Sequence, residues 1–281
     1  MKPRDLVAIL NVPKAERLAL IAEGLDLLAE HVSTLRDDLL HLQEAGRSRG
    51  AAVIDGLASE EAAKMLILLD VVRMGWSDTA AVRGQLRNFY SHLARGIYGR
   101  LIAGRPADLA EVRRYAESLR RSLYLDGPND VDWIFRNSIE AEREESLYVD
   151  YVTSEDDSAW ITPARLSDLK LTSWPSMAVD LALALRHLGC TTQAGLEIIA
   201  KEWDGFSLDD DTHWAKVEAI NKSILIKLHA AGLCSSDLTR VDVRLALEQW
   251  IFPLGGVDLS QIKVTKTELL AERERWVTSQ W

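Results

Sequence analysis

The sequence predicts an all-α fold, in which an N-terminal helical bundle is followed by a C-terminal helical domain. Apolar residues recur every three or four positions through most of the 281 residues, and no segment shows the apolar–polar alternation of a β-strand. Glycines, prolines and capping residues divide these patterns into pieces of helical length. With 47% hydrophobic and 27% charged residues, the composition is that of an ordinary globular protein, and we expect a cytoplasmic protein without a membrane segment.

The longest helix is expected near the N-terminus, over about residues 13–46. Its apolar residues are spaced alternately by three and four positions: Leu18, Ile21, Leu25, Leu28, Val32, Leu35, Leu39 and Leu42. This period is typical of a bundle or coiled-coil seam. A second helix is expected over about 51–74, ending at Gly75.

A third helix is expected to run unbroken from a cap at Ser77 or Asp78 to about residue 104. Its apolar stripe consists of Val82, Leu86, Phe89, Leu93, Ile97 and Leu101. A fourth helix follows a cap at Asp108, and a fifth covers about 131–149.

The remaining helices of the sequence are expected over 176–188, 192–203, 212–231, 236–250 and 264–280. The polar stretch from Thr153 to Ser158 separates them from the N-terminal helices. Domain boundaries fall in such polar linkers. We therefore expect two domains, a helical bundle over 10–152 and a helical domain of unknown role over 159–281.

The net charge of −10 is unevenly distributed along the chain. From Arg73 to Arg121 there are ten arginines and four acidic residues, whereas from Ser122 to Asp157 there are eleven acidic residues and two arginines. The two segments are either solvated helix faces, or a phosphate-facing surface beside an acidic flank that repels or docks something.

The basic segment contains an arginine, a polar residue and a histidine at short spacing: Arg87, Asn88 and His92. On one continuous helix with Leu86 facing the core, Arg87 lies at the edge of the outer face. Four polar residues then face away from the core: Asn88, Ser91, His92 and Arg95. An arginine offers a forked, permanent cation to phosphate oxygens, and a histidine titrates near neutral pH. This outer face is therefore a candidate site for a phosphodiester.

Metal-independent cleavage of RNA needs a base for the ribose 2′-OH, an acid for the leaving 5′-oxygen and cations for the charge that develops on the phosphate. One histidine cannot fill both roles in one step. We therefore expect a two-fold dimer to bring two histidines and two arginines to one phosphate. The expected products are a 2′,3′-cyclic phosphate and a 5′-hydroxyl, and no cofactor or metal ion is expected.

The same spacing occurs a second time, because Arg36 precedes His41 by five residues on the first helix. With 23 arginines and six histidines in the chain, chance alone places such a pair in about every second chain of this size. Spacing alone therefore does not separate either copy from a solvated helix face.

Two charged residues interrupt the apolar stripe of the second helix, Glu61 and Lys64. In one interpretation they form a buried ion pair that fixes the helix register. In the other, Glu61 approaches the third helix and orients Arg87 or the substrate. We favour the ion pair for Lys64, and both interpretations stay open for Glu61.

These motifs resemble those of the HEPN superfamily of helical ribonucleases, and within it the AbiV-like abortive-infection proteins of bacteria. In such proteins a long amphipathic helix precedes an Ala-x-Glu-Glu-x-x-Lys-like motif, here Ala58–Lys64. A later helix carries Arg, a polar residue, three variable residues and His, here Arg87–His92. The order of the motifs fits Arg87 and His92, and does not fit the earlier copy. The resemblance covers about residues 10–150.

The resemblance implies a homodimer with a composite site, metal-independent RNase activity and a toxin-like role in defence against phage. By matching position, Arg87 binds the phosphate, His92 is the catalytic histidine, Asn88 is an auxiliary polar residue and Glu61 is a supporting acid. As further substrate contacts we expect Arg83, Ser91, Arg95 and Lys64.

The expected partners are an RNA substrate, a second copy of the chain, and an antitoxin or a phage-derived activator protein. An alternative from a different class is a non-catalytic helical interaction module. Its acidic surface would dock a basic partner.

Overall fold

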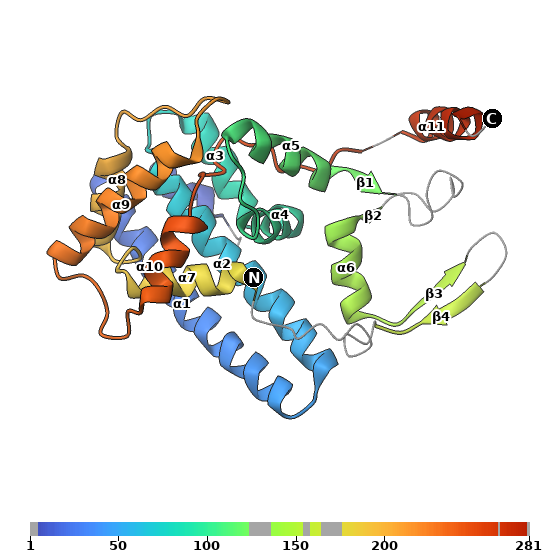
Figure 1. Ribbon diagram of the computed structural model, residues 1–281, viewed down its shortest axis with the longest axis horizontal. Coiled ribbons are helices and arrows are strands. Elements are labelled where there is room, and N and C mark those ends of the chain that lie inside the picture. The colour runs from blue at the N-terminus through green and yellow to red at the C-terminus, as the bar shows by residue number, and fades with distance from the viewer. Residues whose placement is uncertain (1–4, 124–135, 154–157, 164–175, 264, 280–281) are drawn as a thin grey trace.

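The computed structural model describes residues 5–123, 136–153, 158–163, 176–263 and 265–279 (Figure 1). Within these ranges the chain is mostly helical, which confirms the predicted all-α fold. The N-terminal helices are a 3₁₀ helix at Leu6–Asn11, α1 (Lys14–Glu44), α2 (Ser48–Met74), α3 (Thr79–Asn88), α4 (His92–Ile102), α5 (Leu109–Arg120) and α6 (Ser138–Leu147). The later helices are α7 (Met177–His187), α8 (Gln193–Trp203), α9 (Trp214–Ala230), α10 (Arg240–Glu248) and α11 (Lys266–Ser279).

The helix α2 lies at the centre of the fold and forms a long hairpin with α1 (Figure 1). The predicted apolar seam of α1 is confirmed, because Ile21, Leu25 and Val32 are buried on it. Every residue of α2 from Met65 to Arg73 is buried, since α1, α3, α4, α7 and α8 all contact this helix. This stretch of α2 therefore has no solvent face, and its polar residues must find partners inside the protein.

Helices of the C-terminal part pack directly on the N-terminal hairpin. Both α7 and α8 contact α1 and α2. Buried apolar residues from the two parts of the sequence consequently belong to one continuous core. The helix α11 lies apart from that core in Figure 1. The division into domains at 10–152 and 159–281 stays a prediction.

A buried ion pair joins α2 to the segment that follows α10. Arg73 Nη1 lies 3.1 Å from Asp70 Oδ1, and the two side chains are 1% and 4% exposed. Asp70 Oδ2 also accepts hydrogen bonds from the Tyr98 hydroxyl and from the Leu254 amide, both at 2.8 Å, while Arg73 donates to the Ile251 carbonyl. Burial raises the pKa of Asp70, and the Arg73 guanidinium is the strongest opposing influence. This network holds the segment after α10 on α2.

The expectation of one unbroken helix over 77–104 is wrong, because α3 and α4 are separate helices. In the turn between them, the amides of Tyr90 and Ser91 each donate to the carbonyl three residues earlier, at 3.1 Å. The Ser91 hydroxyl then caps α4 by accepting a hydrogen bond from the Ala94 amide. The turn changes the helical phase, so that Arg95 is buried instead of facing solvent.

Two short antiparallel hairpins are present where no strand was predicted. They are β1 (Ser122–Leu123) with β2 (Arg136–Asn137), and β3 (Asp150–Thr153) with β4 (Ser158–Ile161). Strands of two to four residues are too short to show readable alternation. The helix expected over 131–149 is shortened to α6 because β2 precedes it, and residues 131–135 lie outside the described residues. The expected linker over 153–158 falls at the end of the second hairpin, with 154–157 outside the described residues.

The acidic segment packs onto the basic segment through α6. Gly96 of α4 lies against Ile139, and a Cβ at Gly96 would overlap the Ile139 side chain. Beside this close approach, Glu142 of α6 forms an ion pair with Arg100 of α4. Part of the acidic segment is therefore docked within the same chain, against the middle and the C-terminal end of α4.

Candidate active site

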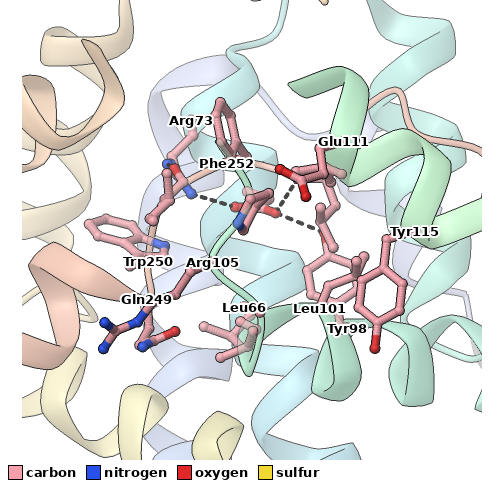
Figure 2. Close-up of a pocket in the computed structure, with 17 residues that line it drawn as sticks. Leu66, Arg73, Tyr98, Leu101, Arg105, Glu111, Tyr115, Gln249, Trp250 and Phe252 are labelled. Carbon is pink, nitrogen blue, oxygen red and sulfur yellow. Dashed lines mark hydrogen bonds and ion pairs between the residues drawn. The ribbon is translucent and has the colours of Figure 1, made fainter. Parts of the chain in front are cut away.

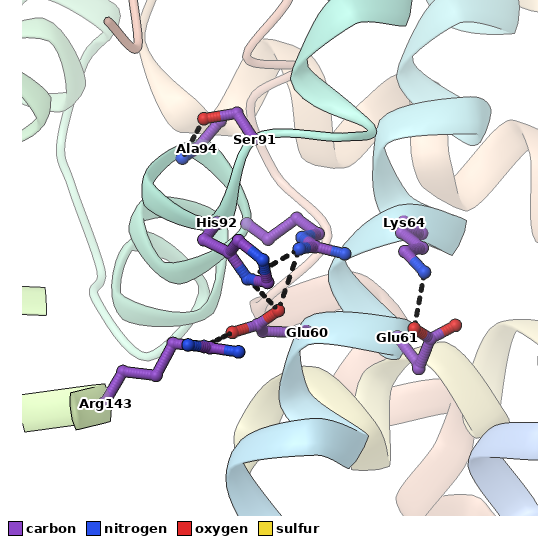
Figure 3. Close-up of polar contacts among 8 residues, drawn as sticks. Glu60, Glu61, Lys64, Ser91, His92, Ala94 and Arg143 are labelled. Atoms are coloured by element: carbon purple, nitrogen blue, oxygen red, sulfur yellow. Dashed lines mark hydrogen bonds and ion pairs between the residues drawn. The ribbon is translucent and has the colours of Figure 1, made fainter. Parts of the chain in front are cut away.

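The carboxylate of Glu60, on α2, is the centre of the candidate active site (Figure 3). Its Oε2 atom lies 2.8 Å from Nδ1 of His92 and 3.0 Å from Nη2 of Arg95, both on α4. Its Oε1 atom accepts a hydrogen bond of 3.0 Å from Nε of Arg143 on α6. One carboxylate, only 14% exposed, thus gathers three basic side chains from two other helices.

The imidazole of His92 is half exposed at the first position of α4. Its Nδ1 atom lies 2.7 Å from Nη2 of Arg95 as well as 2.8 Å from Glu60. One ring nitrogen cannot accept a hydrogen bond from a guanidinium and donate a hydrogen bond to a carboxylate at the same time. Because Arg95 already contacts Glu60, we assign the Nδ1 proton to the hydrogen bond with Glu60. Nε2 then has the free lone pair, and within the described part of the chain no group contacts it.

The guanidinium of Arg95 is a buried counter-ion of Glu60. Arg95 is 7% exposed, although the sequence predicted that it faces solvent. Burial lowers the pKa of Arg95, and the carboxylates of Glu60 and Glu61 oppose that shift. An arginine keeps its charge in a protein. Arg95 is therefore placed to fix Glu60, and the expected direct contact of Arg95 with substrate does not fit its burial.

Glu61 and Lys64 form an ion pair with each other, as one of the two interpretations predicted. Their side chains are 19% and 17% exposed, and Lys64 Nζ lies 5.3 Å from the centre of the Phe89 ring. Figure 3 shows this pair separate from the His92 group. The acid that reaches His92 is Glu60 instead of Glu61. Neighbouring residues on a helix are rotated by about 100° about its axis, so the two side chains leave α2 in different directions. Among the described contacts, none joins Glu61 to Arg87.

The side chains of Asn88 and Ser91 are engaged at the junction of α3 and α4. Asn88 Nδ2 donates to Gln85 at 3.2 Å, and Gln85 donates to the Tyr98 hydroxyl of the buried network. Ser91 Oγ accepts the capping hydrogen bond from Ala94 at 3.2 Å. These contacts shape the junction that presents His92. The expected auxiliary and substrate-binding roles of Asn88 and Ser91 stay predictions.

The arginines Arg83 and Arg87 are exposed on α3, and neither contacts an acidic residue in the described part of the chain. The second copy of the motif is built differently. Arg36 lies 4.0 Å from Asp180 of α7, and the exposed His41 has no carboxylate partner among the described residues. Of the two motif histidines, His92 alone is therefore held by an acid among the described residues.

Sequence reasoning missed two residues of this cluster, Glu60 and Arg143. Glu60 precedes Glu61 in the same motif. Glu61 lies within the apolar stripe of the helix, and this position favoured it as the supporting acid. Arg143 is one of two bases among eleven acids, and such an isolated base was a usable signal for an ion pair. Its partner was not predictable, because the packing of α6 on α4 brings it there.

The fold and the site define a mostly helical protein with one carboxylate holding a histidine and two arginines. No family model, curated protein or solved structure matches the chain. No described helix has the length and apolar character required to span a membrane. A functional assignment must therefore be argued from the side chains of this chain.

Proposed function

We propose that this chain is a metal-independent endoribonuclease of the HEPN type, with His92 as its catalytic histidine. The observation that carries the proposal is the 2.8 Å contact between Glu60 Oε2 and His92 Nδ1. A carboxylate that holds one ring nitrogen orients the imidazole and leaves the other nitrogen for proton transfer. Exchange of His92 for alanine tests the proposal, as detailed in the Discussion.

The proposed reaction uses the 2′-hydroxyl of the RNA as the nucleophile. Nε2 of a neutral His92 removes the proton of the 2′-OH, and the 2′-oxygen attacks the adjacent phosphorus. The bond from phosphorus to the 5′-oxygen breaks, and a protonated His92 of a second copy donates its proton to that oxygen. A 2′,3′-cyclic phosphate and a 5′-hydroxyl result.

The charges around His92 suggest which cations meet the phosphate. Arg95 and Arg143 are occupied by Glu60. Arg83 and Arg87 of the preceding helix are exposed, so their guanidinium groups are available to phosphate oxygens. We assign Arg87 the main role, as the resemblance implies, and Arg83 an accessory one.

The cellular part of the proposal rests on the resemblance. It describes a cytoplasmic, toxin-like effector that stops growth during phage infection. An antitoxin would restrain it, or a phage-derived protein would activate it.

Glu60→Gln tests whether this carboxylate positions His92. The change keeps the size of the side chain and removes the charge that faces Arg95 and Arg143. We expect kcat/KM for RNA cleavage to fall about 10- to 100-fold, by analogy with other orienting carboxylates, and its pH profile to shift.

The matched comparison is Glu61→Gln, one residue further, which removes the charge that pairs with Lys64. It should cost less activity than Glu60→Gln and leave the shape of the pH profile unchanged. Equal losses in the two variants would show that Glu60 has no special relation to His92.

A composite site makes activity depend on protein concentration, because each copy supplies one His92. Specific activity should fall when the protein is diluted below the dissociation constant of the dimer. Activity assays over a dilution series, together with light scattering, measure both quantities. A monomer with undiminished specific activity would rule out the composite site.

A further inference from the structure

A groove of about 360 Å³ lies between α2, α4 and α6, and both Glu60 and Arg143 line it. Apolar side chains form much of its walls, among them Leu57, Ile139 and Leu147. A cavity of about 150 Å³ holds benzene in another protein, so this groove has room for a substituted ring. The groove therefore adjoins the candidate active site and is large enough for a small organic molecule.

The floor of the groove is formed by small residues, which include Gly56, Ser59 and Gly99. A Cβ atom at Gly56 would meet no atom within 4 Å, so open space lies directly next to this position. On an ideal helix Asp55 and Glu60 are about 140° apart, on either side of Gly56. The carboxylates of Asp55 and Glu60 consequently lie towards opposite edges of the floor.

The charges that line the groove do not balance. Three acids and two arginines line it among the described residues. Glu60 pairs with Arg143, and Glu142 pairs with Arg100. The third acid is Asp55, and no lysine or arginine of the described residues forms an ion pair with it. The groove therefore has one negative charge in excess, at Asp55.

The carboxylate of Asp55 is only partly exposed and lies at one wall of the groove. Its Oδ1 atom accepts a hydrogen bond of 3.1 Å from the amide of Ser176, which lines the same groove. Its Oδ2 atom accepts none from a described residue and is not fully buried, so a ligand can reach it. Burial raises the pKa of Asp55, the Ser176 amide opposes this shift, and the nearby Asp180 adds to it. A carboxylate partly withdrawn from water, with no cation beside it, favours a cationic ligand.

A second hollow of the protein lacks such an unpaired charge. It has a volume of about 180 Å³ and lies between α2, α4, α5 and the segment 249–254 (Figure 2). Its buried charges, Asp70 and Arg73, pair with each other. A cationic ligand is therefore expected in the groove beside Glu60 and not in this cavity.

We propose that the groove binds a small organic cation with a planar amidinium or guanidinium group and a compact apolar body. Two N–H groups of the ligand donate to the carboxylate of Asp55, because a planar pair of N–H groups matches the two oxygens of a carboxylate. Oδ1 can accept this hydrogen bond as well as that from Ser176, since each carboxylate oxygen has two lone pairs. The apolar body lies over Gly56, against Leu57 and Ile139.

Calorimetric titration of the full chain with benzamidine, without RNA, tests the proposal independently of the ribonuclease activity. Asp55→Asn keeps the size of the side chain and an acceptor for the Ser176 amide, and removes the charge. It should weaken binding at least about tenfold, because the charge-assisted hydrogen bonds are lost. Thermal unfolding checks that the variant is folded.

Asp180→Asn is the matched control for Asp55→Asn. Burial also raises the pKa of Asp180, but this residue does not line the groove. The control should change the affinity by less than about threefold at physiological ionic strength, because salt screens a charge outside the groove. Equal effects of the two variants would overturn the role of Asp55.

Gly56→Leu is a second variant, which places a side chain in the open space of the groove. Leucine also favours a helix more than glycine does, so the variant should fold and should not bind benzamidine. Undiminished binding by Gly56→Leu, or no binding of benzamidine to the wild-type protein up to its solubility limit, would overturn the site.

Two analogues of benzamidine probe the ligand class. Benzamide has nearly the same shape without the charge, and benzoate has the opposite charge. Both should bind more weakly than benzamidine. Equal affinity for benzamide or benzoate would overturn the proposed chemistry.

Discussion

His92→Ala is expected to lower RNA cleavage by about 100- to 10,000-fold, which is the usual contribution of a general acid or base. The loss arises because the other described side chains that Glu60 holds are arginines, Arg95 and Arg143. An arginine keeps its proton in a protein and cannot replace the histidine as acid or base. The fold should be unaffected, since the His92 side chain is 51% exposed and Arg95 and Arg143 keep Glu60 paired. Single-turnover cleavage of a labelled RNA and thermal unfolding measure the two effects.

The control for this experiment is His41→Ala, which alters the second copy of the same spacing. His41 is an exposed histidine on a helix, five residues after an arginine, as His92 is. It has no carboxylate partner among the described residues, so His41→Ala should cleave RNA at the wild-type rate. Full activity of His92→Ala would remove the catalytic assignment.

Asp70→Ala is expected to lower the free energy of unfolding by about 3–5 kcal/mol, because it leaves the Arg73 guanidinium buried without its counter-ion. The change also removes the acceptor of the Tyr98 hydroxyl and the Leu254 amide. A domain is typically stable by about 5–15 kcal/mol, so the variant should be close to unfolding. Urea denaturation followed by circular dichroism measures the difference.

An exposed ion pair provides the comparison for Asp70→Ala. Glu117 lies 3.1 Å from Arg121 on the surface, and both side chains are more than half exposed. Glu117→Ala should cost no more than about 0.5 kcal/mol. A similar small effect of Asp70→Ala would mean that the network between α2 and the segment after α10 does not hold the fold together.

Helix positions were predictable wherever a long apolar period coincided with a cap. The 3.5-residue seam of α1 placed that helix to within two residues at each end. The carboxylates of Asp78 and Asp108 cap α3 and α5 as predicted, by accepting hydrogen bonds from amides of the first turn. Local chemistry of this kind is readable without knowledge of the tertiary structure.

The break between α3 and α4 was not predictable from periodicity, because Phe89 and Leu93 continue the apolar spacing across it. No glycine or proline marks the turn, and the only local signal is Ser91, which is a good helix-capping residue. The consequence for the site is large. Arg95 becomes a buried counter-ion, while His92 occupies the start of a new helix.

The candidate histidine could be predicted from the motif, but its acidic partner could not. A helical wheel for α2 favoured Glu61, whereas the packing of α4 on α2 selects Glu60. Arg143 reaches Glu60 because Gly96 allows α6 to approach α4 closely. Such contacts depend on how helices distant in sequence pack, which spacing along the chain does not specify.

End-group analysis of RNA cut by the purified protein in the presence of a metal chelator tests the central claim most directly. We predict fragments that end in a 2′,3′-cyclic phosphate and begin with a 5′-hydroxyl, produced by the wild-type protein and not by His92→Ala. Fragments with 5′-phosphate ends, or cleavage that the chelator abolishes, would contradict metal-independent attack by the 2′-hydroxyl at His92.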